Sequence, residues 1–283
     1  TEKTWQYANE FLLPRFMVIN KIDKEHADFG HALETATSSF ARSIVPFTLP
    51  IGKEGNFKGV VDVVHQKAYE FDADGKAKGI AIPSEGKDIF DRTRERLIEI
   101  VAESDDALME KYFNDGTLPE EDIYPNLAKA IAASKLCPVY AVSAGTLAGL
   151  SILLDHIVEF APNPATHEAE YGFTDAEMSG DRINRKYSND EPFSAYVFRT
   201  IADPFAGRIN VMKVVSGKIA SDATVLNCSR DTQERLGSLH VIQGKTLDKV
   251  NEAATGDIIA VVKLKDTQTG DTLCDKAKPI VFP

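Results

Sequence analysis

Two polar stretches that directly follow apolar runs carry the residue types needed to recognise a guanine base. The apolar run at residues 16–19 is followed by Asn20, Lys21 and Asp23. The carboxylate of Asp23 can accept two hydrogen bonds from the N1–H and N2–H2 edge of guanine, whereas adenine presents an acceptor there. The amide of Asn20 can serve the acceptors on the far edge of the ring, and the apolar stem of Lys21 can lie over its face. These residue types favour a guanine site.

The second stretch is Ser143-Ala144, which follows the apolar run at residues 139–142. Small residues at this point let a backbone N–H approach the guanine carbonyl oxygen closely. Ligands of open α/β sheets bind beyond the carboxyl ends of the strands, so the two stretches would meet if their strands are neighbours. Each stretch alone has an ordinary explanation, because Asn, Asp and Ser are common turn residues. Their joint occurrence after two buried strands favours a nucleotide site.

The elements that position these residues are two predicted parallel strands, at 16–19 and 139–142. A helix around residues 31–42 follows the first strand. A helical pattern from Leu150 to Val158 follows the second, with Leu150, Leu153, Leu154, Ile157 and Val158 on its apolar side.

About 118 residues separate the two strands, although a helical crossover needs only a dozen or so. We therefore predict an inserted module at 46–135, with residues 1–45 and 136–161 forming the flanking parts of one α/β domain. Within the insert, alternating apolar residues around Asp74-Gly75 predict a hairpin.

Helices are also expected in the insert. The stretch from Asp88 to Phe113 predicts one or two amphipathic helices. Thr117 and Glu120 have capping-box spacing and predict the start of another. Charged residues in the first of these helices predict a solvated face with i,i+4 pairs: Asp91, Arg92, Arg94, Glu95, Arg96 and Glu99.

The pattern changes after Pro164. Short runs rich in β-branched and aromatic residues are separated by Gly, Asp and Asn turns, and no helical period is visible beyond about residue 180. This pattern is typical of an all-β barrel or sandwich and predicts a separate β domain at 162–283.

Composition limits the classes of partner. The 283 residues are 43% hydrophobic and 27% charged, which indicates a globular chain of two or three modules. Of the net charge of −11, residues 1–165 carry −9 and residues 166–283 carry −2. This balance argues against duplex binding through a basic face, while local RNA contacts on the second part remain open. No apolar run approaches the roughly 18 residues of a membrane span, so no membrane partner is expected.

Cysteine and histidine usage indicates neither a zinc motif nor a disulfide framework. The three cysteines are scattered without a CxxC pair, and the six histidines show no recognised ligand spacing. We therefore expect no metal site and a reducing, cytoplasmic location.

Six stretches of the sequence, in order and over nearly the whole chain, resemble the bacterial elongation factor G family of translational GTPases. They are NKIDKEHADF, LPIGKEGNFKGVVDVV, LMEKYFNDGTLPEEDI, SAG, SNDEPFSAYVFRTIADPFAGRINVMKVVSG and LKDTQTGDTLCD. The resemblance implies part of a P-loop-GTPase-type α/β domain with an inserted α+β subdomain, followed by a translation-factor β-barrel.

The resemblance also implies a function. Asn20, Lys21, Asp23, Ser143 and Ala144 would contact the guanine of GTP or GDP. The barrel would bind small-subunit ribosomal RNA, and the insert would dock the ribosomal stalk protein. The parent protein would hydrolyse GTP and promote movement of tRNA and mRNA, which this part affects only indirectly.

One departure from the family is large. The sequence has no GxxxxGK[ST] loop to hold phosphates and magnesium. The DxxG pattern at Asp72–Gly75 is interpreted as a hairpin turn, and Asp28-Phe29-Gly30 as a chance match to a kinase tripeptide. Together with a start at Thr1, this predicts an internal fragment with no catalytic residues, no Mg²⁺ ligands, no hydrolysis and at most weak nucleotide binding.

The sequence is compatible with three interpretations of the function. The favoured one is a piece of a translocase GTPase. The second is a paralogous ribosome-bound GTPase, such as a tetracycline-protection or release-factor recycling protein. The third is a non-catalytic ribosome-binding module. Because two strands with one helix each cannot cover a sheet on both faces, residues 1–45 and 136–161 are also expected to expose apolar surface.

Overall fold

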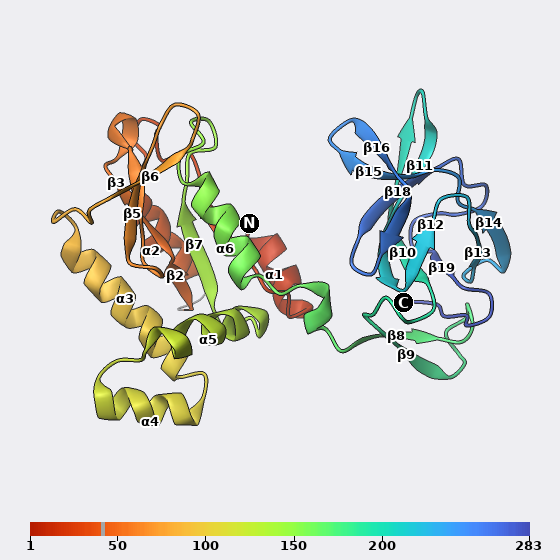
Figure 1. Ribbon diagram of the computed structural model, residues 1–283, viewed down its shortest axis with the longest axis horizontal. Coiled ribbons are helices and arrows are strands. Elements are labelled where there is room, and N and C mark those ends of the chain that lie inside the picture. The colour runs from red at the N-terminus through yellow and green to blue at the C-terminus, as the bar shows by residue number, and fades with distance from the viewer. Residues whose placement is uncertain (41–42) are drawn as a thin grey trace. The chain divides into compact units, whose positions relative to one another are not determined.

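The computed structural model describes residues 1–40 and 43–283, which divide into two units (Figure 1). Thr1–Pro162, here called the α/β unit, mixes helices with two sheets, and Asn163–Pro283, here called the barrel unit, is built of strands. This confirms the predicted fold class of an α/β part followed by an all-β part. The predicted boundaries of the insert, 46 and 135, stay predictions. The predicted end of a helix at 41–42 lies outside the described residues.

A three-stranded parallel sheet lies at the centre of the α/β unit. Its order is β1-β7-β2, with β1 at Met17–Ile19, β7 at Cys137–Ala141 and β2 at Ile44–Pro46. Both predicted strands are therefore confirmed and are direct neighbours, with Ile19 opposite Ala141. The expectation of only two parallel strands was wrong. Pro46 lies in the edge strand β2, where a missing N–H is tolerated.

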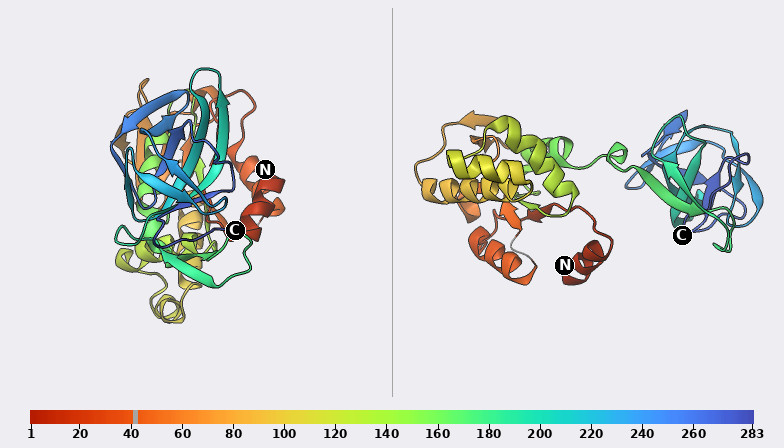
Figure 2. Two further views of the ribbon diagram at one scale, coloured as in Figure 1. Left: turned by 90° about the vertical axis from the view of Figure 1, so that its right-hand side faces the viewer. Right: turned by 90° about the horizontal axis from the view of Figure 1, so that it is seen from below.

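Strand β7 divides its side chains between two cores, because successive residues of a strand point to opposite faces. Tyr140, and Val142 just after the strand, pack in one cluster with residues of the helices that precede β7 and with α6, Leu150–Phe160. Val139 and Ala141 pack in the other, with α1, Glu2–Glu10, and α2, Phe29–Ser39. Figure 2 shows helices on both sides of this sheet. All of β7 is buried, as expected for a central parallel strand.

The helices that follow the sheet strands begin at identifiable signals. The Asp28 side chain accepts a hydrogen bond from the His31 amide at 2.9 Å and caps α2, which accounts for the Asp28-Phe29-Gly30 tripeptide. Helix α6 begins after Gly149, whose φ is +80° and whose Cα faces the Ala141 carbonyl too closely for a Cβ. Only glycine satisfies both conditions without strain.

A four-stranded antiparallel sheet follows β2 in the α/β unit. Its order is β3-β4-β5-β6, and the strands are β3 Thr48–Ile51, β4 Gly59–Asp62, β5 Lys67–Phe71 and β6 Ala77–Ile80. The predicted hairpin is confirmed as β5 and β6. Asp72 Oδ1 accepts from the Asp74 and Lys76 amides at 3.0 and 2.9 Å, so the DxxG pattern is indeed turn chemistry. A 3₁₀ turn, Glu54–Asn56, joins β3 to β4.

Three helices connect β6 to β7: α3 Lys87–Ala102, α4 Asp106–Asp115 and α5 Glu120–Ala132. The first two are the predicted amphipathic pair, and Asp105 caps the second of them. The predicted start of another helix is confirmed by α5, but the capping box was wrong, because Pro119 is the N-cap and no side chain caps the helix. The solvated face predicted for α3 was wrong at Arg94, which is buried and donates to the Val63 and Val64 carbonyls at 3.2 and 2.7 Å.

The barrel unit contains an eight-stranded antiparallel sheet in the order β14-β13-β19-β10-β11-β18-β15-β16, with two small ribbons, β12-β17 and β8-β9. Figures 1 and 2 show the strands of this unit curving around a shared interior. Its core includes Ala195, Met212, Leu236, Leu239 and Ile259. The strands are β8 Ala169–Phe173, β9 Arg182–Lys186, β10 Ser194–Asp203, β11 Gly207–Ser216, β12 Lys218–Ala220, β13 Thr224–Asn227, β14 Thr232–Arg235, β15 Leu239–Gln243, β16 Thr246–Val250, β17 Glu252–Ala254, β18 Ile258–Val262 and β19 Thr272–Cys274, after a 3₁₀ turn at Pro164–Thr166.

The barrel unit also contains a disulfide between Cys228 and Cys274, whose Cα atoms lie 6.6 Å apart. The expectation that the cysteines do not pair was therefore wrong for these two. They are 46 residues apart, and the pairing of β13 with β19 brings them together. Cys137 is a free, buried thiol.

The α/β unit exposes apolar side chains where the sequence predicted them. Leu12 is 75% exposed and Val158 is 87% exposed. The predicted apolar side of α6 is split, because Leu153 is buried whereas Leu154 and Ile157 are exposed. Among the described residues, no helix has both the length and the apolar character needed to cross a bilayer.

Candidate nucleotide-binding site

The pairing of β1 with β7 brings the two predicted polar stretches into direct contact. The chain leaves β1 through Asn20 and Lys21, and Lys21 has a φ of +65° that turns it sharply. The Ile22 amide then donates to the Val142 carbonyl at 3.5 Å, next to Ser143. The residues predicted to form one site from sequence positions more than a hundred apart are therefore neighbours.

Asn20 connects the two stretches. Its Oδ1 accepts from the Lys21 amide at 2.7 Å and from the Ala144 amide at 3.0 Å. This leaves the Nδ2 group as the donor that Asn20 can offer to a purine acceptor. The backbone amide of Ala144, predicted to contact the base, instead bonds to Asn20 in this structure. Its role here is to fix the distance between the two strand exits.

Asp23 makes a second connection. Its Oδ1 accepts from the Ser143 hydroxyl at 2.7 Å, and its Oδ2 pairs with the Lys24 ammonium at 2.7 Å. The Lys24 ammonium, and then the Ser143 hydroxyl, hold the pKa of Asp23 below its usual value. Asp23 is therefore ionised at neutral pH, as an acceptor of two donors must be. The Lys24 side chain is 66% exposed, and such a surface pair is weak enough for a ligand to displace.

The loop after β7 is held from two sides. The Ser143 amide donates to the Ala148 carbonyl at 2.9 Å, and the Thr146 amide lies 3.4 Å from the Ser143 hydroxyl. On the other side, Gly75 at the tip of the β5–β6 hairpin packs so closely on Leu147 that a Cβ there would collide with it. The antiparallel sheet thus supports the loop that carries Ser143 and Ala144. Lys21, Ala144 and Gly145 are exposed and can meet a ligand.

A separate polar cluster in the α/β unit was missed by the sequence analysis. Asp62, His65 and His156 each place one ligand atom within 4.8 Å of the other two. No spacing rule could reveal it, because Asp62 and His156 are 94 residues apart. Burial alone would raise the pKa of Asp62, but hydrogen bonds from His156 and His65 outweigh it and hold the pKa far below its usual value. The same carboxylate raises the pKa of His65.

The comparison with known families concerns the barrel unit. Residues 192–276 match the model of elongation factor G domain 2. This segment begins just before β10 and ends just after β19, so it spans the strands of the large sheet. The barrel unit is therefore similar to a translation-factor domain, as the sequence resemblance implied.

A comparison of structures covers both units. The chain is similar to a crystal structure of a protein from Thermus thermophilus, with a TM-score of 0.82 and 29% sequence identity. The match covers 99% of this chain and 38% of that chain. This chain therefore spans well under half the length of that protein. The two matches together support a fragment of the translational-GTPase type.

Proposed function

We propose that this chain is the guanine-reading part and second domain of a translational GTPase of the elongation factor G type. The observation that carries the proposal is the joining of two strand exits by the Asn20–Ala144 and Asp23–Ser143 hydrogen bonds. These bonds hold a carboxylate, an amide and a small-residue loop at the carboxyl edge of a parallel sheet, where nucleotides bind in α/β folds. The match of residues 192–276 to elongation factor G domain 2 supports the same class.

In the proposed mechanism, Asp23 exchanges the Lys24 ammonium for the N1–H and N2–H2 donors of guanine. Asn20 donates from Nδ2 to an acceptor on the opposite edge, and the Lys21 stem covers the ring face. The loop at Ser143 and Ala144 closes around the carbonyl edge of the base. Adenine is rejected because it would place an acceptor against a carboxylate and leave polar groups unpaired.

GTP hydrolysis, in this proposal, belongs to the parent protein. The sequence has no phosphate-binding loop, so these residues read the base and do not act on the phosphates. Ribosomal translocation of tRNA and mRNA in the cytoplasm is the proposed process. Within it, the barrel unit contacts small-subunit ribosomal RNA, and the inserted subdomain contacts the stalk protein.

The proposal is tested by amide chemical-shift titration of the full chain with millimolar GDP and with ADP. GDP is expected to shift the amide signals of Asn20, Lys21, Asp23 and Ala144 selectively. A Glu85→Gln variant, altered at an exposed position in the same unit, serves as the matched control and should behave as the parent chain does. Equal shifts with both nucleotides, or no shifts at these residues, would refute the proposed base recognition.

Calorimetry tests whether this chain, whose sequence has no phosphate-binding loop, binds nucleotide tightly. We expect no micromolar binding of GTP or GDP and no release of phosphate, because most of the affinity in such folds comes from phosphates and magnesium. Micromolar affinity for GTP or GDP would contradict the proposal that these residues contact the base and not the phosphates. A translocation assay on a longer protein that contains this chain separates a translocase from a paralogous ribosome-bound GTPase.

A further inference from the structure

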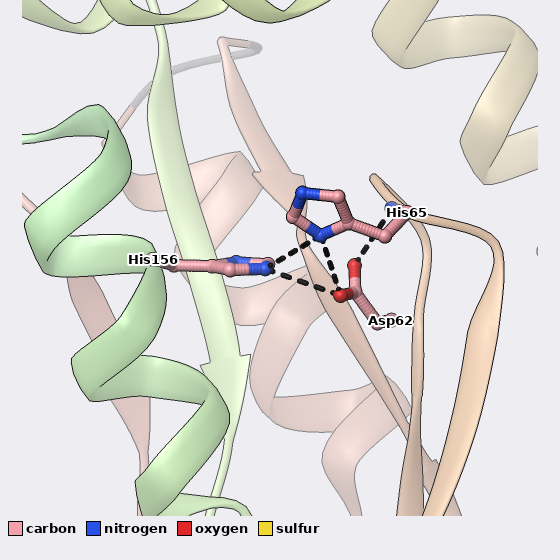
Figure 3. Close-up of side chains that lie close together, drawn as sticks. All are labelled: Asp62, His65 and His156. Atoms are coloured by element: carbon pink, nitrogen blue, oxygen red, sulfur yellow. Dashed lines mark hydrogen bonds and ion pairs between the residues drawn. The ribbon is translucent and has the colours of Figure 1, made fainter. Parts of the chain in front are cut away.

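Three side chains from two parts of the α/β unit converge on one point (Figure 3). Asp62 ends β4, His65 lies in the turn before β5, and His156 lies in the middle of α6. Asp62 Oδ2 is 2.8 Å from His65 Nδ1 and 3.2 Å from His156 Nε2. The third side of the triangle, from His156 Nε2 to His65 Nδ1, is also 3.2 Å.

Hydrogen bonds alone leave this triangle incompletely satisfied. If both imidazoles donate to Asp62 Oδ2, two N–H groups face each other across the 3.2 Å side between the rings. If one ring instead keeps its proton on the nitrogen that points away, its lone pair faces the carboxylate, at 2.8 Å for His65 or 3.2 Å for His156. A single cation removes both conflicts, because it accepts one lone pair from each of the three atoms. In a tetrahedral site with bonds of about 2.0–2.1 Å, ligand atoms lie about 3.3 Å apart, close to the observed separations.

Neighbouring groups fix the orientation that a metal site needs. Asp62 Oδ1 accepts from the Val64 and His65 amides at 2.9 and 3.0 Å, which aims Oδ2 at the two rings. His65 Nε2 lies 3.2 Å from a carboxylate oxygen of Glu159, which can accept the Nε2 proton when Nδ1 binds a metal. A carboxylate behind a ligating histidine is the usual support of a metal-binding imidazole.

Burial and charge also fit a cation. Asp62 is 2% exposed and His156 is 1% exposed, so a negative charge is held where water cannot neutralise it. Glu159 adds a second carboxylate on the outer side of His65. The guanidinium of Arg94 is committed to the Val63 and Val64 carbonyls, to which it donates hydrogen bonds. The His65 side chain is 24% exposed, so the cluster lies near the surface of the unit.

We propose that Asp62, His65 and His156 form a binding site for one divalent transition-metal ion, with Zn²⁺ the best match. Two imidazole nitrogens and one carboxylate oxygen suit Zn²⁺ and disfavour Mg²⁺, which prefers oxygen ligands. The metal would tie the turn between β4 and β5 to α6, the helix that follows the Ser143 loop. Its role is therefore structural and independent of whether the chain reads guanine.

The test is a Zn²⁺ titration of the chelator-treated full chain by calorimetry, with metal content measured after dialysis. One Zn²⁺ per chain and a higher melting temperature are expected, and Mg²⁺ at the same concentration should have no effect. His65→Gln and His156→Gln should each abolish stoichiometric binding. His31→Gln, which alters an exposed histidine of α2, is the matched control and should bind as the parent chain does.

Glu159→Gln keeps the proposal testable if a variant of the buried residues fails to fold. This side chain is 39% exposed, and its replacement should weaken Zn²⁺ binding about 10–100-fold without unfolding the chain. Co²⁺ bound to the parent chain should give the intense visible absorption of a tetrahedral site. Failure to bind Zn²⁺ at one per chain, binding unchanged in folded His65→Gln, or an octahedral Co²⁺ spectrum would overturn the proposal.

Discussion

Glu234 of the barrel unit provides a sharp test of how a buried carboxylate organises the segment before β19. The residue lies on β14 and is 2% exposed. Its Oε1 accepts from the Asp266 amide at 2.8 Å, the Thr267 amide at 3.0 Å and the Thr267 hydroxyl at 2.9 Å. Its Oε2 accepts from the Lys265 amide at 3.2 Å. One side chain thus satisfies four donors of a segment that forms no regular structure.

The change Glu234→Gln keeps the size of the side chain and removes its charge. If the amide oxygen takes the place of Oε1, three hydrogen bonds survive in weakened form, because charge-assisted bonds are about twice as strong as neutral ones. The new NH₂ group then faces the Lys265 amide, donor against donor. Partial solvent access at Lys265 and Asp266 moderates the loss. We expect the free energy of unfolding of the barrel unit to fall by about 2–4 kcal/mol.

The assay must report on the barrel unit alone. The only tryptophan of the chain, Trp5, lies in the other unit, so its fluorescence does not serve. Amide hydrogen exchange followed by mass spectrometry on peptides covering 232–235 and 264–271 gives the free energy locally. Glu252→Gln, at an exposed position of β17, is the control and should change it by less than about 0.5 kcal/mol. A Glu234→Gln effect as small as the control would refute the reasoning.

Two further predictions concern one residue in each unit. Gly217→Ala should destabilise the barrel unit by at least about 2 kcal/mol, because φ is +71° and a Cβ would lie 2.6 Å from the Glu191 carbonyl oxygen. Gly244 has open space around it, so Gly244→Ala should cost about 1 kcal/mol in the same hydrogen-exchange measurement. Equal costs for the two variants would contradict the steric argument. Burial raises the pKa of the Cys137 thiol from 9.0 to about 11. The buried neutral thiol therefore stabilises the α/β unit fully below pH 9, and this stabilisation is lost as the pH rises through about 11. Denaturation followed by Trp5 fluorescence should show a loss of about 2–3 kcal/mol over this range that Cys137→Ala lacks, and parallel pH profiles of the two proteins would count against it.

The sequence predicted the features that depend on local patterns. The apolar runs before Asn20 and Ser143 were recognised as parallel strands because buried strands of such sheets are continuously apolar. Their adjacency in the sheet was the condition for a shared site, and the pairing of β1 with β7 meets that condition. The Asp74-Gly75 hairpin was recognised from its turn residues.

The features that were missed depend on contacts distant in sequence. Arg94 looks like one charge among many on a helix, and only the packing of α3 on the Val63 and Val64 carbonyls shows why it is buried. The Cys228–Cys274 disulfide depends on the order of strands in the barrel unit. Within the candidate site, the residues were predicted but their mutual hydrogen bonds were not.

The central claim, that Asp23 reads the donor edge of guanine, is tested most directly by the change Asp23→Asn. An asparagine offers one acceptor and one donor, which match the N1–H and C2 carbonyl of xanthine and mismatch guanine. In amide chemical-shift titrations, the parent chain should respond at Ala144 to GDP and not to xanthosine diphosphate. The account predicts that Asp23→Asn reverses this preference while the rest of the spectrum stays unchanged. An unchanged preference in the folded variant would contradict it.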